Sequence, residues 1–153
     1  TRSVGVTGVQ TCALPISSHH RDKLPFAAGI KAGASAVMLA HAIYPHLSGK
    51  EELAMFSPYI INKLLREELN FQGIIITDAL NMQAAQATES ATIAPLAIKA
   101  GVDMLMMPSS VELATGTLKT AIDNGEISLQ RLNQSLRRIW QVKANLGLLA
   151  KQN

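Results

Sequence analysis

Three short apolar runs in this chain are each followed by polar side chains that could do chemistry. The runs are Ala36 to Ala40, Gly73 to Thr77 and Asp103 to Met107. His41 follows the first run, Asp78 follows the second, and Ser109 follows the third after Pro108. Carboxylate and imidazole groups are common carriers of acid–base chemistry. Asp78 is the most informative of them, because burying a carboxylate beside an apolar strand without a purpose would cost free energy.

The apolar runs are predicted to be strands of a parallel sheet. Each run is continuously apolar, as expected when both faces of a strand are buried. Helical patterns lie between the runs, and this alternation is typical of βα units. Functional side chains in such proteins gather at the carboxyl ends of the strands, because the loops there share one opening. We therefore expect His41, Asp78 and Ser109 at one edge of the sheet.

Each of these residues also has a purely structural interpretation. Asp78 could cap a helix that follows its strand, which is a common position for aspartate. His41 could be a core histidine whose ring nitrogens are satisfied, and spacing alone favours that interpretation. The methionines are most simply core filling. Those in and around the predicted strands are Met38, Met82, Met104, Met106 and Met107.

Glycines and caps predict where the helices begin and end. The segments Ile30 to Gly33 and Ile98 to Gly101 each precede a strand, and their glycines can turn a helix end directly into that strand. A helix between the first two strands is expected to start with Ser57 as its N-cap and to stop at Asn70 to Gly73. Its apolar side is formed by Ile60, Ile61, Leu64, Leu65 and Leu69.

Two further helices are predicted after the third strand. Ser109 or Ser110 can cap one that runs to about Asp123, and Ser128 can cap the last helix, which ends before Gly147. The last helix is expected to pack on the outer face through an apolar row. That row is Leu129, Leu132, Leu136, Ile139 and Leu146.

The predicted fold class is α/β, with about three parallel strands and flanking helices. Pattern alone allows an open doubly wound sheet or part of a (βα)8 TIM barrel. No GxGxxG follows a strand and no P-loop is present, which removes the usual reason to prefer a nucleotide-binding fold.

Composition excludes several classes of function. Hydrophobic residues make up 48% of the 153 residues, and the net charge of +3 is spread along the chain, so neither disorder nor nucleic-acid binding is indicated. No apolar stretch approaches the roughly 20 residues of a membrane span. The single cysteine, Cys12, and the histidines lack the spacing of a zinc site. The sequence therefore indicates no metal and no cofactor.

The first residues resemble something other than natural protein. The run from Val6 to Ile16 is similar to the translation of an adapter used in short-read DNA library preparation. A genuine strand or the end of a signal peptide is the alternative, but no positive or long apolar region precedes the run. We therefore expect residues 1–17 to be non-native, and residues 18–150 to form the partial catalytic domain described next.

The segment from Phe71 to Met82 resembles the nucleophile strand of glycoside hydrolase family 3. The form Thr-Asp-Ala-Leu-x-Met, from Thr77 to Met82, is typical of the β-N-acetylhexosaminidase branch, whereas the β-glucosidase branch usually carries tryptophan directly after the aspartate. Other stretches are similar to the same branch. They include Ala32 to Ala34, Met38 to His41, Leu64 to Leu69, Ala100 to Met104, and the residues Asn133, Ser135, Arg138, Ile139 and Lys143.

The resemblance implies a retaining glycosidase that removes terminal β-linked N-acetylglucosamine from sugars derived from peptidoglycan or chitin. Asp78 would be its catalytic nucleophile, and His41 and Met82 would bind the substrate. The acid/base histidine of this branch belongs to a Lys-His-Phe-Pro-Gly-His-Gly type motif, which is absent from this sequence. His19 and His20 lack the glycine and proline context of that motif and are not assigned the role.

A closed barrel takes about 250 residues, so this chain is expected to supply only the later βα units. Alone it should be inactive, with one sheet surface uncovered. Two alternatives remain: a β-glucosidase or β-xylosidase of the same family, and a non-catalytic half-barrel that binds sugar or protein and retains Asp78 as a helix cap.

Overall fold

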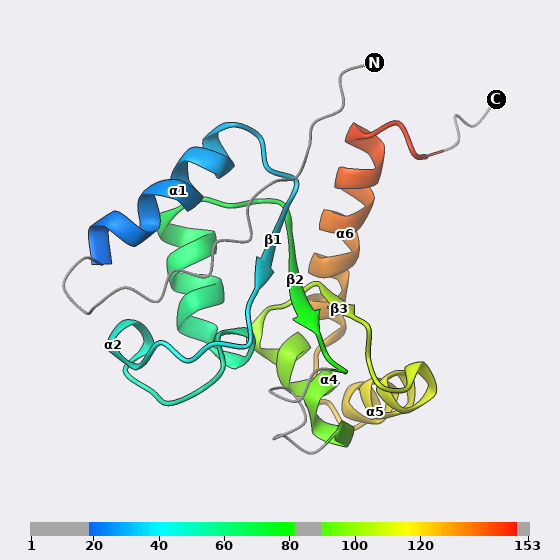
Figure 1. The fold of residues 1–153 in the computed structure, drawn as a ribbon. Coiled ribbons are helices and arrows are strands. Elements are labelled where there is room, and N and C mark those ends of the chain that lie inside the picture. The colour runs from blue at the N-terminus through cyan, green and yellow to red at the C-terminus, as the bar shows by residue number, and fades with distance from the viewer. Residues whose placement is uncertain (1–18, 82–89, 150–153) are drawn as a thin grey trace.

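A computed structural model describes residues 19–81 and 90–149 of the chain (Figure 1). The segment 1–17, expected to be non-native, and the candidate Met82 lie outside the described residues. The described elements are α1 (His19–Lys31), β1 (Ala36–Leu39), α2 (Pro45–Ser48), the 3₁₀ turn η1 (Ala54–Phe56), the π-helix η2 (Tyr59–Glu68), β2 (Ile74–Ala79), α4 (Ser90–Ala100), β3 (Met104–Met106), α5 (Val111–Asp123) and α6 (Leu129–Asn145).

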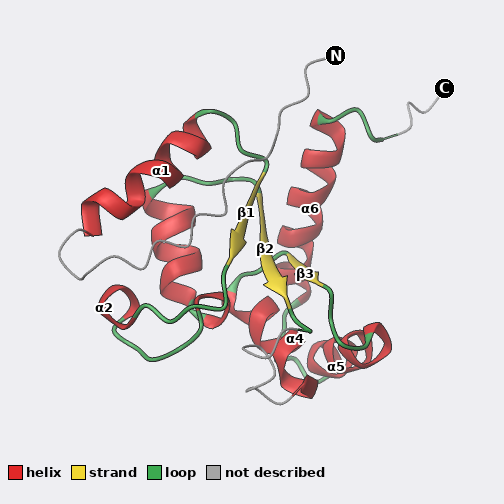
Figure 2. Ribbon diagram, in the orientation of Figure 1, coloured by secondary structure: helices red, strands yellow, loops and turns green. Residues whose placement is uncertain are grey.

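The three strands form one parallel sheet in the order β1-β2-β3. Strand β2 lies in the middle, with β1 on one side and β3 on the other (Figure 2). The predicted α/β class with three parallel strands is confirmed. The bounds differ in one respect that matters: β2 continues to Ala79, so that Asp78 is a residue of the strand rather than the residue after it.

Two glycines make the predicted turns from a helix into a strand. Gly33 has φ +90° after α1, and Gly101 has φ +129° after α4. Both angles lie in the region that side chains with a Cβ rarely adopt. A Cβ on Gly101 would also collide with the side chain of Ile61 in η2. This close approach lets η2 and the α4–β3 turn pack together.

Helix η2 buries the predicted side but is not capped as predicted. Ile60, Ile61, Leu64 and Leu65 are buried. The carbonyl of Ser57 accepts a hydrogen bond from Ile61 N at 3.1 Å, but the buried hydroxyl of Ser57 has no hydrogen-bond partner. The predicted side-chain cap is therefore wrong, because η1 folds directly in front of Ser57 and buries it.

The helices cover one face of the sheet and leave the other face partly open. Val37 and Leu39 in β1 are buried in the main core, whereas Met38 between them is 37% exposed. Met104 in β3 is exposed to a similar extent, 39%. The expected uncovered sheet surface is thus present at these residues.

Caps at the start of the last two helices form as predicted. Ser110 Oγ accepts a hydrogen bond from Leu113 N at 3.1 Å at the start of α5. Ser128 Oγ accepts one from Arg131 N, also at 3.1 Å, at the start of α6. These bonds satisfy backbone donors that a helix leaves free at its first turn.

Helix α6 packs only in part through the predicted apolar row, of which Leu132 and Ile139 are half-buried. Leu129 and Leu136 are exposed, and so is Trp140 on the same helix. The buried residue of α6 is instead Ser135, flanked by the half-buried Arg131 and Arg138. A polar row attaches α6 to the sheet, because it meets a buried charge described below.

Candidate active site

The predicted functional residues lie at the carboxyl edge of the sheet. The register pairs Leu39 of β1 with Thr77 of β2, so His41 and Asp78 both come just after this pair. Ala79 is paired with Met106 of β3, which brings the start of the β3–α5 loop to the same edge. The expected gathering of His41, Asp78 and Ser109 at one edge agrees with this register.

Asp78 is half-buried and makes few bonds. Its Oδ1 accepts a hydrogen bond from Ala79 N at 2.7 Å. Within the described part of the chain, no lysine, arginine or histidine forms an ion pair with this carboxylate. A carboxylate can accept about four hydrogen bonds, so the described residues leave most of its capacity open to another partner.

The helix-cap interpretation of Asp78 does not fit the residues that follow it. An N-cap side chain accepts a hydrogen bond from the second or third residue of a helix. Ala79 still belongs to β2, and Leu80 and Asn81 form a turn. No helix therefore begins at residues 79–81 for Asp78 to cap.

A β-bulge in β2 encloses Asp78. Ile76 is paired with Met104 and Ala79 with Met106, so β2 takes three steps where β3 takes two. Bulges of this kind occur near active sites, where they change the direction of a side chain. The backbone irregularity thus coincides with the candidate catalytic carboxylate.

His41 has two buried ring nitrogens, Nδ1 and Nε2, with no hydrogen-bond partner. The described residues therefore do not supply the partners that a satisfied core histidine would need. An unsatisfied buried polar group costs roughly 1–3 kcal/mol. Such groups persist where function needs them or where a partner is supplied from outside. A hydroxyl or amide of a ligand is a suitable partner for either nitrogen.

Sequence reasoning missed a second aspartate, at the opposite end of the sheet. Asp103 precedes β3, and its side chain is fully buried. Its carboxylate accepts hydrogen bonds from four groups. These are Arg66 Nη2 at 2.5 Å, Ser135 Oγ at 2.6 Å, Ile75 N at 3.0 Å and Arg138 Nη1 at 3.1 Å. This is the buried charge to which the polar row of α6 donates hydrogen bonds, through Ser135 and Arg138.

Two arginines extend this network to the turns before the strands. Arg66 donates to the carbonyls of Phe71 and Gly73 at 2.8 and 2.7 Å, just before β2. Arg131 donates to the carbonyls of Ile98 and Val102 at 3.0 and 2.6 Å, before β3. The sequence did offer one signal for this network: charged residues stand within segments predicted to be buried. A buried charge needs a partner, so these residues were candidates for pairing with one another.

Burial and the aspartate act in opposite directions on these arginines. Desolvation lowers the pKa of Arg66 to about 10, while the neighbouring Asp103 carboxylate raises it in part. Desolvation also lowers the pKa of Arg131, again opposed by Asp103. Arg66 therefore stays charged at neutral pH.

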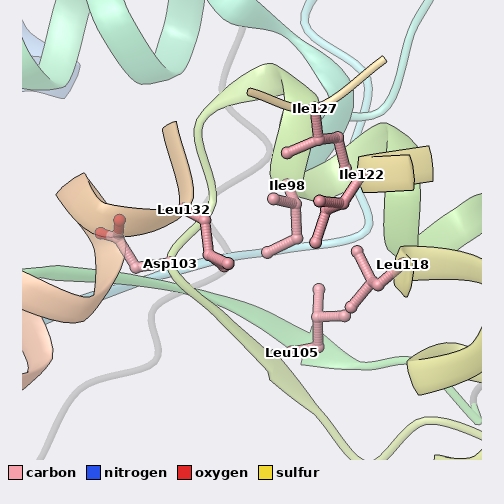
Figure 3. Close-up of a pocket in the computed structure, with 7 residues that line it drawn as sticks. All are labelled: Ile98, Asp103, Leu105, Leu118, Ile122, Ile127 and Leu132. Carbon is pink, nitrogen blue, oxygen red and sulfur yellow. The ribbon is translucent and has the colours of Figure 1, made fainter. Parts of the chain in front are cut away.

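A pocket of about 280 Å³ opens beside this network (Figure 3). Its lining is aliphatic apart from Asp103, whose carboxylate is turned toward α6. The lining residues are Ile98, Asp103, Leu105, Leu118, Ile122, Ile127 and Leu132. The oxygens of Asp103 are already bonded, so this pocket offers no free polar group to orient a sugar.

A second hollow, which Asp78 does not line, is much smaller. It has a volume of about 20 Å³ and lies between Leu80, Ile93 and the Pro108 to Ser110 segment. A site for a small ligand usually measures roughly 300–1,000 Å³. Across residues 19–81 and 90–149, no three acidic, histidine or cysteine side chains gather as a metal site would require.

None of the described helices is both long and apolar enough to cross a lipid bilayer.

The fold and the site define a class: parallel α/β proteins that carry a lightly bonded carboxylate at the end of a central strand. Comparison with known families makes this specific. Residues 10–142 match the family described as the glycosyl hydrolase family 3 N terminal domain, and the chain belongs to this family.

Individual relatives agree with the family. The chain is 38% identical over 105 residues to a β-hexosaminidase of Methylococcus capsulatus, covering 68% of this chain and 30% of the relative. It is 29% identical over 133 residues to a β-N-acetylglucosaminidase/β-glucosidase of Cellulomonas fimi, covering 80% of this chain and 24% of the relative.

A solved structure supports the fold in three dimensions. The family 3 β-N-acetylglucosaminidase of a Paenibacillus species matches with a TM-score of 0.78 and 30% identity, over 84% of this chain and 25% of that protein. The family resemblance inferred from Asp78 and its neighbours is thus confirmed. The chain spans less than a third of the length of each of these proteins.

Proposed function

We propose that the protein to which this chain belongs is a retaining β-N-acetylhexosaminidase with Asp78 as its nucleophile. The observation that carries the proposal is the state of Asp78: a half-buried carboxylate in a strand bulge, with one local hydrogen bond and no ion-pair partner in the described part of the chain. The names of the similar proteins, β-hexosaminidase and β-N-acetylglucosaminidase, support the reaction and the sugar.

The chemistry follows from a free carboxylate at this position. A carboxylate oxygen of Asp78 attacks the anomeric carbon of the sugar while the bond from that carbon to the glycosidic oxygen breaks. The departing oxygen takes a proton from an acid group roughly 5 Å from Asp78, which lies in another part of the protein. Water then attacks the same carbon, releases Asp78 and gives its proton to that group.

His41 is proposed to bind the sugar. Its two ring nitrogens are buried and unsatisfied beside the strand that carries Asp78, so a sugar hydroxyl or acetamido group would supply the missing hydrogen bond. Met82 is proposed to contact the apolar face or the acetamido group of the same sugar. The glycans that fit this proposal are those derived from peptidoglycan or chitin.

The test uses the whole protein and a nitrophenyl β-N-acetylglucosaminide. Asp78→Asn should lower kcat on the order of a thousandfold or more, because the nucleophile is lost. The matched control is Asp123→Asn, since Asp123 is an exposed carboxylate on α5 paired with Lys119. The Asp123→Asn protein should keep the activity of the unaltered protein. Equal activity of Asp78→Asn and the unaltered protein would refute the nucleophile assignment.

The second candidate is a β-glucosidase, favoured by the dual name of the Cellulomonas fimi relative. A panel of nitrophenyl glycosides separates the two. The proposed enzyme should show the highest kcat/KM with the N-acetylglucosaminide. A higher kcat/KM with the glucoside or xyloside would favour the second candidate, and no hydrolysis of any sugar would favour the non-catalytic half-barrel.

A further inference from the structure

At its amino end, β2 is hydrogen-bonded to Asp103, the residue before β3. Both the backbone N–H and the backbone carbonyl of Ile75 take part. Asp103 N donates a hydrogen bond to Ile75 O at 2.8 Å, and the Asp103 carboxylate accepts one from Ile75 N at 3.0 Å. Ile75 lies three residues before Asp78. The position of β2 at this point is therefore set by the position of the Asp103 carboxylate.

A second pair of hydrogen bonds lies at the bulge itself, on either side of Asp78. Thr77 Oγ1 accepts a hydrogen bond from Met106 N at 3.0 Å, and Leu80 N donates one to Met106 O at 2.9 Å. Thr77 is fully buried. Asp78 lies between Thr77 and Leu80, whose bonds to Met106 form this second pair, and inside the one stretch of β2 that contains an extra residue.

The Asp103 carboxylate, which bonds to Ile75 N, accepts further hydrogen bonds that fix its position. Charged and hydroxyl donors from η2 and α6, namely Arg66, Arg138 and Ser135, fix the carboxylate that Ile75 N contacts. Charge-assisted hydrogen bonds are stronger than neutral ones and restrict geometry further. A slip of β2 by one residue would break these contacts and move Asp78 to the other face of the sheet.

We propose that Asp103 and Thr77 are positioning residues that place the Asp78 carboxylate for attack on the sugar carbon. The inference rests on the proposed function of Asp78. Asp103 lies at the opposite end of the sheet, so it acts through the β2 backbone, and Thr77 acts through its bond to Met106. Accuracy matters here, because a displacement of about 1 Å can cost roughly a hundredfold in rate.

The test measures how fast Asp78 reacts, separately from how tightly the sugar binds. The whole protein is treated with an activated fluoro-N-acetylglucosamine that carries a dinitrophenolate leaving group. An Asp78 oxygen bonds to the anomeric carbon, dinitrophenolate leaves with the bonding electrons, and the slow-reacting sugar stays attached. The experiment gives the inactivation rate constant, the inhibitor dissociation constant and the final fraction of labelled protein.

Thr77→Val is the principal variant, because it keeps the shape of the side chain and removes the acceptor for Met106 N. The inactivation rate constant should fall by about ten- to a hundredfold, while the inhibitor dissociation constant stays within about twofold. The matched control is Thr117→Val, since the Thr117 hydroxyl bonds only to carbonyls of its own helix α5. That control should react at the unaltered rate.

Asp103→Asn tests the contact between the Asp103 side chain and Ile75 N. Its amide oxygen can still accept from Ile75 N, but the charge that holds Arg66 and Arg138 is lost. A fall in the inactivation rate constant is expected here too. Protein that fails to fold lowers only the final labelled fraction, so a loss of folding cannot imitate a loss of positioning.

The outcomes separate this inference from the function on which it rests. Unchanged rate constants in both Thr77→Val and Asp103→Asn, with the label on Asp78, would overturn the positioning role and leave the nucleophile assignment standing. Normal labelling of Asp78→Asn, with the label located elsewhere by mass spectrometry, would overturn the proposed function itself.

Discussion

The two ends of the sheet each hold one aspartate, and the two carboxylates are bonded very differently. Asp103, at the amino end, is fully buried and accepts hydrogen bonds from a backbone amide, a serine and two arginines. Asp78, at the carboxyl end, accepts one bond from a described residue, the backbone N–H of Ala79. A saturated carboxylate can only hold the structure together, whereas a carboxylate with free acceptor capacity can still react.

The same contrast holds for the other polar side chains at these ends. Arg66 and Arg131 at the amino end bond to backbone carbonyls as well as to their neighbours. His41 at the carboxyl end has two buried nitrogens with no partner. One end of the sheet is optimised for stability, and the other leaves polar groups unsatisfied, as expected of a binding site.

The largest expected effect comes from exchanging the two aspartates for alanine. Asp103→Ala leaves arginines without their buried partner and should lower the free energy of unfolding by about 3–5 kcal/mol. Asp78→Ala loses one local bond and should change it by less than about 0.5 kcal/mol. Chemical denaturation of the whole protein measures both. Similar losses of unfolding free energy from the two substitutions would contradict the difference in bonding between the two carboxylates.

A neighbouring pair of arginines gives a smaller and better controlled effect. Arg138→Met removes one bond to Asp103 and keeps the apolar stem, so it should cost about 1.5–3 kcal/mol of unfolding free energy. Arg137→Met on the exposed side of α6 removes a charge of the same kind and should be nearly neutral. Denaturation midpoints compare the two, and equal values would mean that the ionic network contributes little stability.

Removing the unsatisfied nitrogens sharpens the contrast at the carboxyl end. His41→Phe replaces the imidazole with an apolar ring and should leave stability unchanged or raise it by up to about 1 kcal/mol, because no hydrogen bond is lost. Hydrolysis of the aryl glycoside should fall in the same variant. A clear drop in melting temperature would show that His41 has a structural role instead.

The smallest effect concerns an ion pair away from both ends. Lys23 of α1 donates to Glu68 of η2 at 2.8 Å, and this hydrogen bond lowers the pKa of Glu68 below its ordinary value of 4.5. The stabilisation is therefore complete above that pH and is lost as the pH falls through the lowered value. Glu68→Gln should remove this small acid dependence from thermal unfolding curves, and an unchanged dependence would assign it to other groups.

Local features of the fold were predictable from the sequence. The positive φ angles of Gly33 and Gly101 and the caps at Ser110 and Ser128 depend on contacts within a few residues. The three strands were predictable because each is a short continuous apolar run. Asp78 was found as a candidate for the same reason, since it directly follows such a run.

The errors in prediction arose where distant parts of the chain meet. The hydroxyl of Ser57 was predicted to cap η2 and is buried without a partner. The apolar row of α6 was predicted to pack on the outer face, but Leu129 and Leu136 stay exposed, Leu132 and Ile139 are only half-buried, and Ser135 is buried instead. Periodicity describes which residues share a helix face, and it does not say which face the rest of the molecule will bury.

The sequence by itself determined the strands, their glycine turns, the family and the aspartate that stands at the end of the central strand. Only the tertiary structure decided that Asp78 lies in a bulge and that Asp103 joins η2, β2, β3 and α6. The physical reason is distance along the chain. The side-chain partners of Asp103 are 32 to 37 residues away in sequence, and a buried charge finds partners that far apart only after the chain has folded.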